Sequence, residues 1–199
     1  SWIRRANYFL DKISTSTLTE AQIKSLSAEC RFIRAYYYFD LVKKYGGMPI
    51  ITDVQVFEDN LAELQVSRNR EDEVYDFILT ELNSAIVDLP EEWDANNANR
   101  ATKSVALALK SRAMLYAGSI AKYGSVQLDG LVGIPAEKEE LYFKEAMAAS
   151  KSIMEGNRFS LYTQLYDPES GSGDPATNYQ NIFQAHYLQP ILYHAQSPC

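Results

Sequence analysis

The sequence is poor in the residues that build metal sites, disulfide frameworks and nucleic-acid surfaces. It contains two cysteines, Cys30 and Cys199, and two histidines, His186 and His194, none of them at a metal-binding spacing. Lys and Arg number 19 against 26 Asp and Glu, a net charge of −7, so the basic surplus that phosphate binding requires is missing. No apolar run approaches the roughly 18 residues that span a bilayer. We therefore expect no metal, no cofactor, no nucleic-acid partner and no membrane-spanning segment.

The sequence also shows no targeting signal, and we expect no disulfide. The N-terminus, Ser-Trp-Ile-Arg-Arg, has neither an apolar secretory segment nor a lipid-acceptor cysteine. Taken alone, this indicates either a cytosolic protein or a chain from which such segments have been removed. Cys30 falls in an apolar stripe, so we expect a core residue and no disulfide with the terminal Cys199.

Catalytic motifs are equally scarce. No G-x-S-x-G nucleophile motif occurs, and the carboxylates gather in helix first turns and loops, where the helix dipole and solvation explain them. We therefore predict a binding protein and not an enzyme. A helical carbohydrate-active enzyme stays a third alternative, because sequence cannot show whether two carboxylates face each other across a cleft.

Hydrophobic residues make up 46% of the 199, enough to form the core of one domain. Their period is helical over five segments, and no alternation of strands with helices appears, so we predict a mainly α fold. The starts of the last three helices, near residues 71, 102 and 136, lie 31 and 34 residues apart, near the tetratricopeptide period of about 34. The predicted helices cover residues 2–13, 19–45, 71–89, 102–123 and 135–156.

The second predicted helix is the most informative. Thr19 and Gln22 have the spacing of a capping box, and Gly46-Gly47 end the helix. Two apolar stripes predict an interior helix that packs on two sides. One stripe is Ile23, Leu26, Cys30, Ile33, Tyr37 and Leu41; the other is Ala28, Phe32, Ala35, Phe39 and Val42.

Small residues in the fourth predicted helix indicate close approach of neighbouring helices. They are Ala106, Ala108, Ser111, Ala113 and Ala117, with bulk between them from Leu107, Leu115, Tyr116 and Ile120. We expect the fifth helix to pack through Ala146, Ala149, Ile153 and Met154. The extended stretch 48–56 is predicted to be a connecting segment, because no partner strand is evident.

Residues after 156 contain Pro and Gly without any sustained period. We predict a helical scaffold over residues 1–160 and a loop-rich tail over 161–199, the start of a second part.

One stretch resembles a known family. Residues 28–49, AECRFIRAYYYFDLVKKYGGMP, resemble the hallmark A-E-A-x-F-L-R-A-x-x-Y-F-x-L-V-x-x-F-G-x-V-P of the SusD/RagB family. Three further stretches match in the same order, at residues 3–7, 70–85 and 99–116. The resemblance covers about residues 2–160.

The resemblance implies tetratricopeptide-like helix pairs, a SusD-like α-α superhelix. It implies a surface-exposed outer-membrane lipoprotein of Bacteroidetes-type bacteria that binds a glycan or another nutrient without catalysis. Its partners would be an oligosaccharide and a SusC-like TonB-dependent transporter. Family members are longer and carry a signal peptide and a lipid cysteine. We therefore expect a fragment of a protein held at the outer membrane by a lipid anchor outside this chain.

The residues alone leave another function open. The double-striped helix and the acidic balance are also typical of a tetratricopeptide-like scaffold for protein–protein interaction. Arg31 and Arg34 lie three apart, near Glu29, and we expect them to tie their helix to its neighbours; an anion site is the alternative.

Glycan contacts need flat aromatic faces and planar polar groups. Trp93 and Asn96, in the polar loop 91–101, and Tyr162, Tyr166 and Tyr179 in the tail offer that chemistry. The alternative for Trp93 is that it seals the end of the third helix. None of these residues is carried over from the family by motif.

Overall fold

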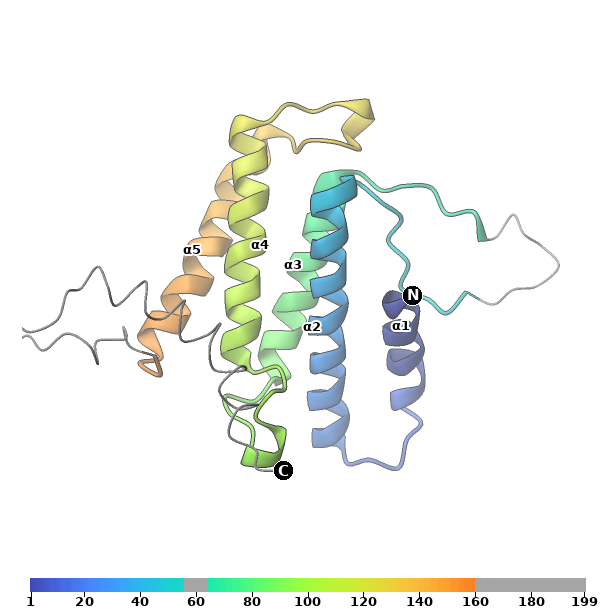
Figure 1. The fold of residues 1–199 in the computed structure, drawn as a ribbon, viewed down its shortest axis with the longest axis vertical. Coiled ribbons are helices and arrows are strands. Elements are labelled where there is room, and N and C mark those ends of the chain that lie inside the picture. Colours follow the sequence, from blue (N-terminus) through green and yellow to red (C-terminus); the bar gives the residue numbers. More distant parts are fainter. Residues whose placement is uncertain (56–63, 160–199) are drawn as a thin grey trace, which may run out of the picture. The chain divides into compact units, whose positions relative to one another are not determined.

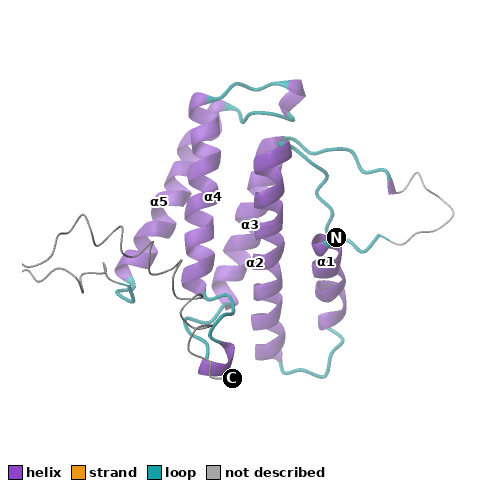
Figure 2. Cartoon of the chain, in the orientation of Figure 1, coloured by secondary structure: helices purple, strands orange, loops and turns teal. Residues whose placement is uncertain are grey.

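The computed structural model describes residues 1–55 and 64–159, and Ser1–Gly156 form one unit in it. Each helix of this unit packs against the next one along the chain, and α2 also touches α4 (Figure 1). No β-strand occurs in the described part, which is built of helices and loops (Figure 2). The predicted mainly α fold of helix pairs is confirmed. The helices are α1 (Trp2–Ile13), α2 (Glu20–Tyr45), α3 (Glu71–Asp88), α4 (Lys103–Tyr123) and α5 (Glu139–Glu155).

Local capping chemistry explains where the helices begin. The Thr19 hydroxyl accepts the N–H of Gln22, and the Gln22 side chain accepts the N–H of Thr19, so the predicted capping box of α2 is confirmed. Thr102 caps α4 by accepting the N–H of Val105. The start of α5 was predicted too early: Pro135 has an extended ψ of 135°, a 3-10 turn follows, and the α-helix begins only at Glu139.

The C-terminal end of α2 is fixed from several directions. Gly46 has a φ of 66°, and a side chain there would collide with the carbonyl oxygen of Leu131. The Arg68 guanidinium donates to the carbonyl oxygens of Tyr45 (2.8 Å) and Gly47 (2.6 Å). A cation is favourable at a helix C-terminus, so Arg68 both satisfies free carbonyls and complements the helix dipole.

The connection after α2 contains neither helix nor strand over its described residues, 48–55, so the predicted connecting segment is confirmed there. Tyr38 accepts the N–H of Ile51 through its hydroxyl (2.8 Å), and Asn7 donates to the carbonyl oxygens of Ile51 (2.8 Å) and Asp53 (3.2 Å). These side chains from α1 and α2 satisfy a backbone that has no partner strand.

Two buried clusters form the core, and the smaller one joins Ala28, Ala85, Leu89 and Ala106. In the larger one, side chains of α2 and α3 meet those of α4 and α5. Its members are Ala35, Tyr38, Phe39, Val42, Met48, Val74, Tyr75, Ile78, Leu82, Ala113, Met114, Ala117, Ala121, Ile134, Tyr142 and Ala146.

The two predicted stripes of α2 are buried or half-buried, except at one position. The stripe through Ala28, Ala35 and Val42 is buried, but Ile33, from the other stripe, is 41% exposed. Arg34 is buried in its place, because a buried carboxylate of α3 neutralises its charge.

The predicted faces of α4 and α5 also need correction. Ala113, Ala117 and Ala121 follow one another at four-residue steps on the buried face of α4, which leaves Ala108, Leu115 and Tyr116 on exposed positions. On α5, Ala146 and Ala149 are buried as predicted. Met154 is 76% exposed, and Tyr142 takes the interior position instead.

Candidate functional site

The two arginines of the hallmark helix are committed to structural bonds. Arg34 donates to Glu81 on α3 (2.7 Å) and to Asn7 on α1 (2.8 Å), all with buried side chains. Arg31 donates to the other oxygen of Glu81 (2.8 Å). Glu29 instead pairs with Arg100. The prediction that the arginines tie α2 to its neighbours is confirmed, because their bonds reach α3 and α1.

The loop that contains Trp93 is held by its own hydrogen bonds. The indole N–H donates to the carbonyl oxygen of Ala101 (2.7 Å), and the Arg100 guanidinium lies 3.9 Å from the ring centre. Asp94 accepts the N–H groups of Asn96 and Asn97, and Asn96 is exposed. The half-buried indole is therefore held within its own loop and has one face covered by a cation. Trp93 and Asn96 belong to the same loop, but the indole N–H bonds to Ala101 and not to the Asn96 side chain.

The three tail candidates, Tyr162, Tyr166 and Tyr179, lie outside the described residues. So do His186, His194 and Cys199. Cys30 is described: it is buried, and burial raises the pKa of its thiol to about 11, so it is protonated and a poor nucleophile at neutral pH.

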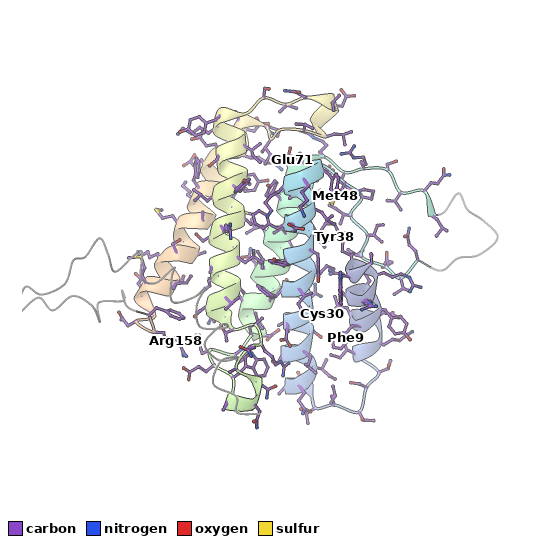
Figure 3. The ribbon with its side chains drawn as sticks, in the orientation of Figure 1. Phe9, Cys30, Tyr38, Met48, Glu71 and Arg158 are labelled. Carbon is purple, nitrogen blue, oxygen red and sulfur yellow. The ribbon has the colours of Figure 1, made fainter. Side chains whose placement is uncertain are left out.

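An aromatic groove between α1 and α2, of about 520 Å³, was not predicted as a site. Trp2 is 57% exposed and its ring lies nearly parallel to that of Tyr37, with 4° between the planes and 5.9 Å between the ring centres. The Arg5 guanidinium lies 4.6 Å from the centre of the Trp2 ring. Phe9 from α1 and Cys30 from α2 lie at the same level of the helix pair (Figure 3). This lining suits flat apolar faces and offers few hydrogen bonds.

A second hollow, of about 430 Å³, is polar. It lies at the end of the unit where α3 begins and α4 ends, with Glu71 in its lining (Figure 3). Burial raises the pKa of the Glu71 carboxyl, although the N–H that Gly133 donates to it acts in the opposite direction. In the sequence, Glu71 is marked only by its position in the first turn of the third predicted helix, 71–89.

In residues 1–55 and 64–159, no three His, Cys, Asp or Glu side chains gather as a group that could hold a metal ion. Across the same residues, no helix combines the length and apolar character needed to cross a bilayer.

A family described as "Starch-binding associating with outer membrane" matches residues 1–115. A SusD-like protein of Bacteroides ovatus is 33% identical over 101 residues, which are 49% of this chain and 18% of the relative. The starch-binding protein SusD of Bacteroides thetaiotaomicron is 30% identical over 116 residues, 58% of this chain and 19% of the relative. The matched part thus corresponds to about a fifth of the length of these relatives.

Solved structures share the fold. A SusD-like protein of Bacteroides fragilis superposes with a TM-score of 0.65 and 30% identity, over 82% of this chain and 27% of the other. A laminarin-binding SusD-like protein gives 0.61 and 26%, over 83% and 30%. A structure containing a xylogluco-oligosaccharide gives 0.64 and 25%, over 85% and 31%.

Proposed function

Because the chain belongs to the SusD-like family, we propose that it is part of a non-catalytic glycan-binding protein of the bacterial cell surface. The observation that carries the proposal is the family match over residues 1–115, which includes the first three helices and most of α4. The starch-binding relative is similar to this chain in sequence, and the laminarin-binding relative shares its fold.

The proposed setting is an outer-membrane uptake system. The protein would hold an oligosaccharide at a SusC-like TonB-dependent transporter, and a lipid anchor outside this chain would attach it to the outer membrane. The family description, which names association with the outer membrane, supports this location. The net charge of −7 argues against a nucleic-acid partner.

Trp93 and Asn96 are proposed as glycan contacts on the described part of the chain, together with Tyr162, Tyr166 and Tyr179 in the tail. The Arg100 stack and the bond to Ala101 hold the indole plane still, which lowers the entropy lost on stacking against a sugar. Asn96 lies three residues away and is exposed.

A second candidate function is a scaffold for protein–protein interaction. The aromatic groove between α1 and α2 favours it, because an apolar hollow of about 520 Å³ could take an apolar side chain of a partner.

Isothermal titration of the full-length protein against starch, laminarin and xyloglucan oligosaccharides tests the proposal, together with co-purification from outer membranes. We expect binding to one of these glycans and recovery of a transporter. Trp93→Ala should weaken the affinity about three- to tenfold, the value of one lost aromatic stack. Tyr8→Ala, on an exposed position of α1, is the matched control. A soluble partner protein with no glycan binding would favour the scaffold.

A further inference from the structure

The polar hollow is formed by two parts of the chain that are far apart in the sequence: the start of α3, and the end of α4 with the loop that follows it. Glu71 comes from the first turn of α3, Tyr123 from the last turn of α4, and Ser125 and Gln127 from the loop that follows. Its volume of about 430 Å³ is in the range of small-molecule sites.

The loop over this pocket is fixed in place. Gln127 and Val132 form an isolated antiparallel bridge, with N–H to carbonyl distances of 2.7 and 3.2 Å. The N–H of Gly47, just past α2, donates to the carbonyl oxygen of Leu131 (2.7 Å). Gly133 has a φ of 87°, and a side chain there would collide with the backbone of Ser125. The pocket is therefore preformed, which reduces the ordering cost of binding.

Glu71 is a buried carboxylate with one donor. It is 6% exposed, and its Oε2 accepts the N–H of Gly133 (2.6 Å). Its neighbour Asp72 is paired with Lys138 (2.7 Å) and Arg70 (3.2 Å), whereas no described cation pairs with Glu71. A buried carboxylate that lines a cavity has the capacity to accept further hydrogen bonds from a ligand.

The lining also offers an aromatic face and neutral polar groups. The Tyr123 side chain is 79% exposed. The Gln127 amide donates to the Ser125 hydroxyl (3.2 Å), so both are held at the loop. A carboxylate, an amide, a hydroxyl and a ring around one hollow match a ligand with hydroxyl groups on its edge and C–H groups on its face.

We infer that this pocket is a saccharide-contact site, in which Glu71 accepts a sugar hydroxyl and Tyr123 stacks on a sugar face. The inference rests on the proposed glycan-binding function and adds a location and a specificity to it. No described cation pairs with Glu71, and the Lys122 ammonium, 5.7 Å from the centre of the Tyr123 ring, is paired with Glu139 (2.9 Å). The site therefore favours neutral sugars over uronate or sulfate groups.

Isothermal titration on the full-length protein tests the site, with maltoheptaose, laminarihexaose and xyloglucan oligosaccharides as neutral probes and oligogalacturonate as the anionic probe. Tyr123→Ala and Gln127→Ala should each weaken binding of the neutral probe about three- to tenfold. Tyr8→Ala is the control with an exposed tyrosine outside the pocket, and circular dichroism checks that all variants are folded.

The outcomes separate the two proposals. Neutral-glycan binding that is unchanged by both Tyr123→Ala and Gln127→Ala would overturn the pocket and leave the glycan-binding function standing. Tighter binding of oligogalacturonate than of every neutral probe would overturn the specificity. Failure of the wild-type protein to bind any glycan would remove the proposed function, and the site with it.

Discussion

Between α2 and α3 the structure buries charge, whereas between α4 and α5 it buries small side chains. Arg34 on α2 bonds to Glu81 on α3 with both side chains 5% exposed or less, and the Tyr38 and Phe77 rings meet edge to face beside them. The same arginine reaches Asn7 on α1. One directional network therefore sets the positions of three helices.

The fully buried residues of the α4–α5 interface are small, and the polar bonds that cross it, Lys110–Glu145 (2.6 Å) and Ser111–Ser150 (2.7 Å), join half-buried side chains. Ala113, Ala117 and Gly118 on α4 are buried, as are Ala146 and Ala149 on α5. Gly118 lies so close to the Phe143 ring that an added Cβ would be 2.7 Å from it. Small residues let the two helices approach closely, and dispersion contacts stabilise the fully buried part of the interface.

The difference predicts two kinds of sensitivity. The charged interface should tolerate changes in volume better than the loss of one partner, because a charge left alone in the core is the costly state. The small-residue interface should tolerate polarity changes at its rim but not added volume.

The largest expected effect comes from breaking the charged interface at Glu81. Glu81→Ala leaves Arg34 buried without its counter-charge, and we expect the free energy of unfolding to fall by about 3–5 kcal/mol. Urea denaturation measures it. Glu140→Ala, which removes an exposed i,i+4 pair with Lys144, is the control and should leave the stability nearly unchanged.

The double variant Arg34→Met with Glu81→Leu sharpens the test. Apolar side chains of similar size remove both charges at once, so we expect it to be clearly more stable than Glu81→Ala. Equal losses in the single and double variants would mean that the charge itself is not what the interface depends on.

The next effect is on the small-residue interface. Gly118→Leu places a side chain where the Phe143 ring lies, and overpacking should cost about 1–3 kcal/mol, with a gain of up to about 1 kcal/mol in helix propensity offsetting part of it. Thermal and urea unfolding measure the net loss. Ala148→Leu, on an exposed position of α5, should be nearly neutral.

A double-mutant cycle with Phe143→Ala tests the cause. If the ring is the obstacle, Gly118→Leu combined with Phe143→Ala should cost less than the sum of the two single changes. Additive losses would place the strain elsewhere.

Local signals were sufficient for the helices. The capping pair at Thr19 and Gln22 and the glycine at Gly46 mark the ends of α2, and Thr102 marks the start of α4. The burial of Arg34 on α2 could not be predicted, because it depends on Glu81, 47 residues away. A charged side chain looks like a surface position until its partner is known.

The candidate sites also divide into one that a local sequence pattern marks and two that depend on helix packing. Trp93 stood out because an aromatic residue and amides lie together in one polar loop. The aromatic groove needs Trp2 and Tyr36 from two helices, and the polar pocket needs Glu71 and Tyr123 from two others. Sequence patterns placed each of these residues on an element, but only the packing of the helices brings them together.

A smaller effect is expected at the N-terminal caps of α2 and α4, which contribute to different interfaces. Thr19→Ala removes a reciprocal capping box on α2 and should cost about 1 kcal/mol of unfolding free energy. Thr102→Ala removes a single long bond of 3.4 Å on α4 and should cost less. Thermal unfolding of both variants checks the order, and Thr80→Ala, at an exposed position inside α3, is the control. The reverse order would show that helix entry is more important for the small-residue pair.

The smallest expected effect is the pH dependence of stability that the buried Glu71 carboxyl, at the start of α3, produces. Burial raises the pKa of Glu71, so the folded chain binds this proton more tightly than the unfolded chain does. The contribution of Glu71 to stability is therefore most favourable below the unfolded pKa of about 4.3, and it declines as the pH rises to the folded pKa.

Glu71→Gln lacks this decline. Its stability relative to the wild type should increase between about pH 4 and the folded pKa and stay constant above it, as urea titrations at stepped pH would measure. Glu140→Gln is the opposite control, because Lys144 lowers the pKa of that exposed carboxyl. Parallel pH profiles for Glu71→Gln and the wild type would mean that the Gly133 N–H fully compensates the buried carboxylate.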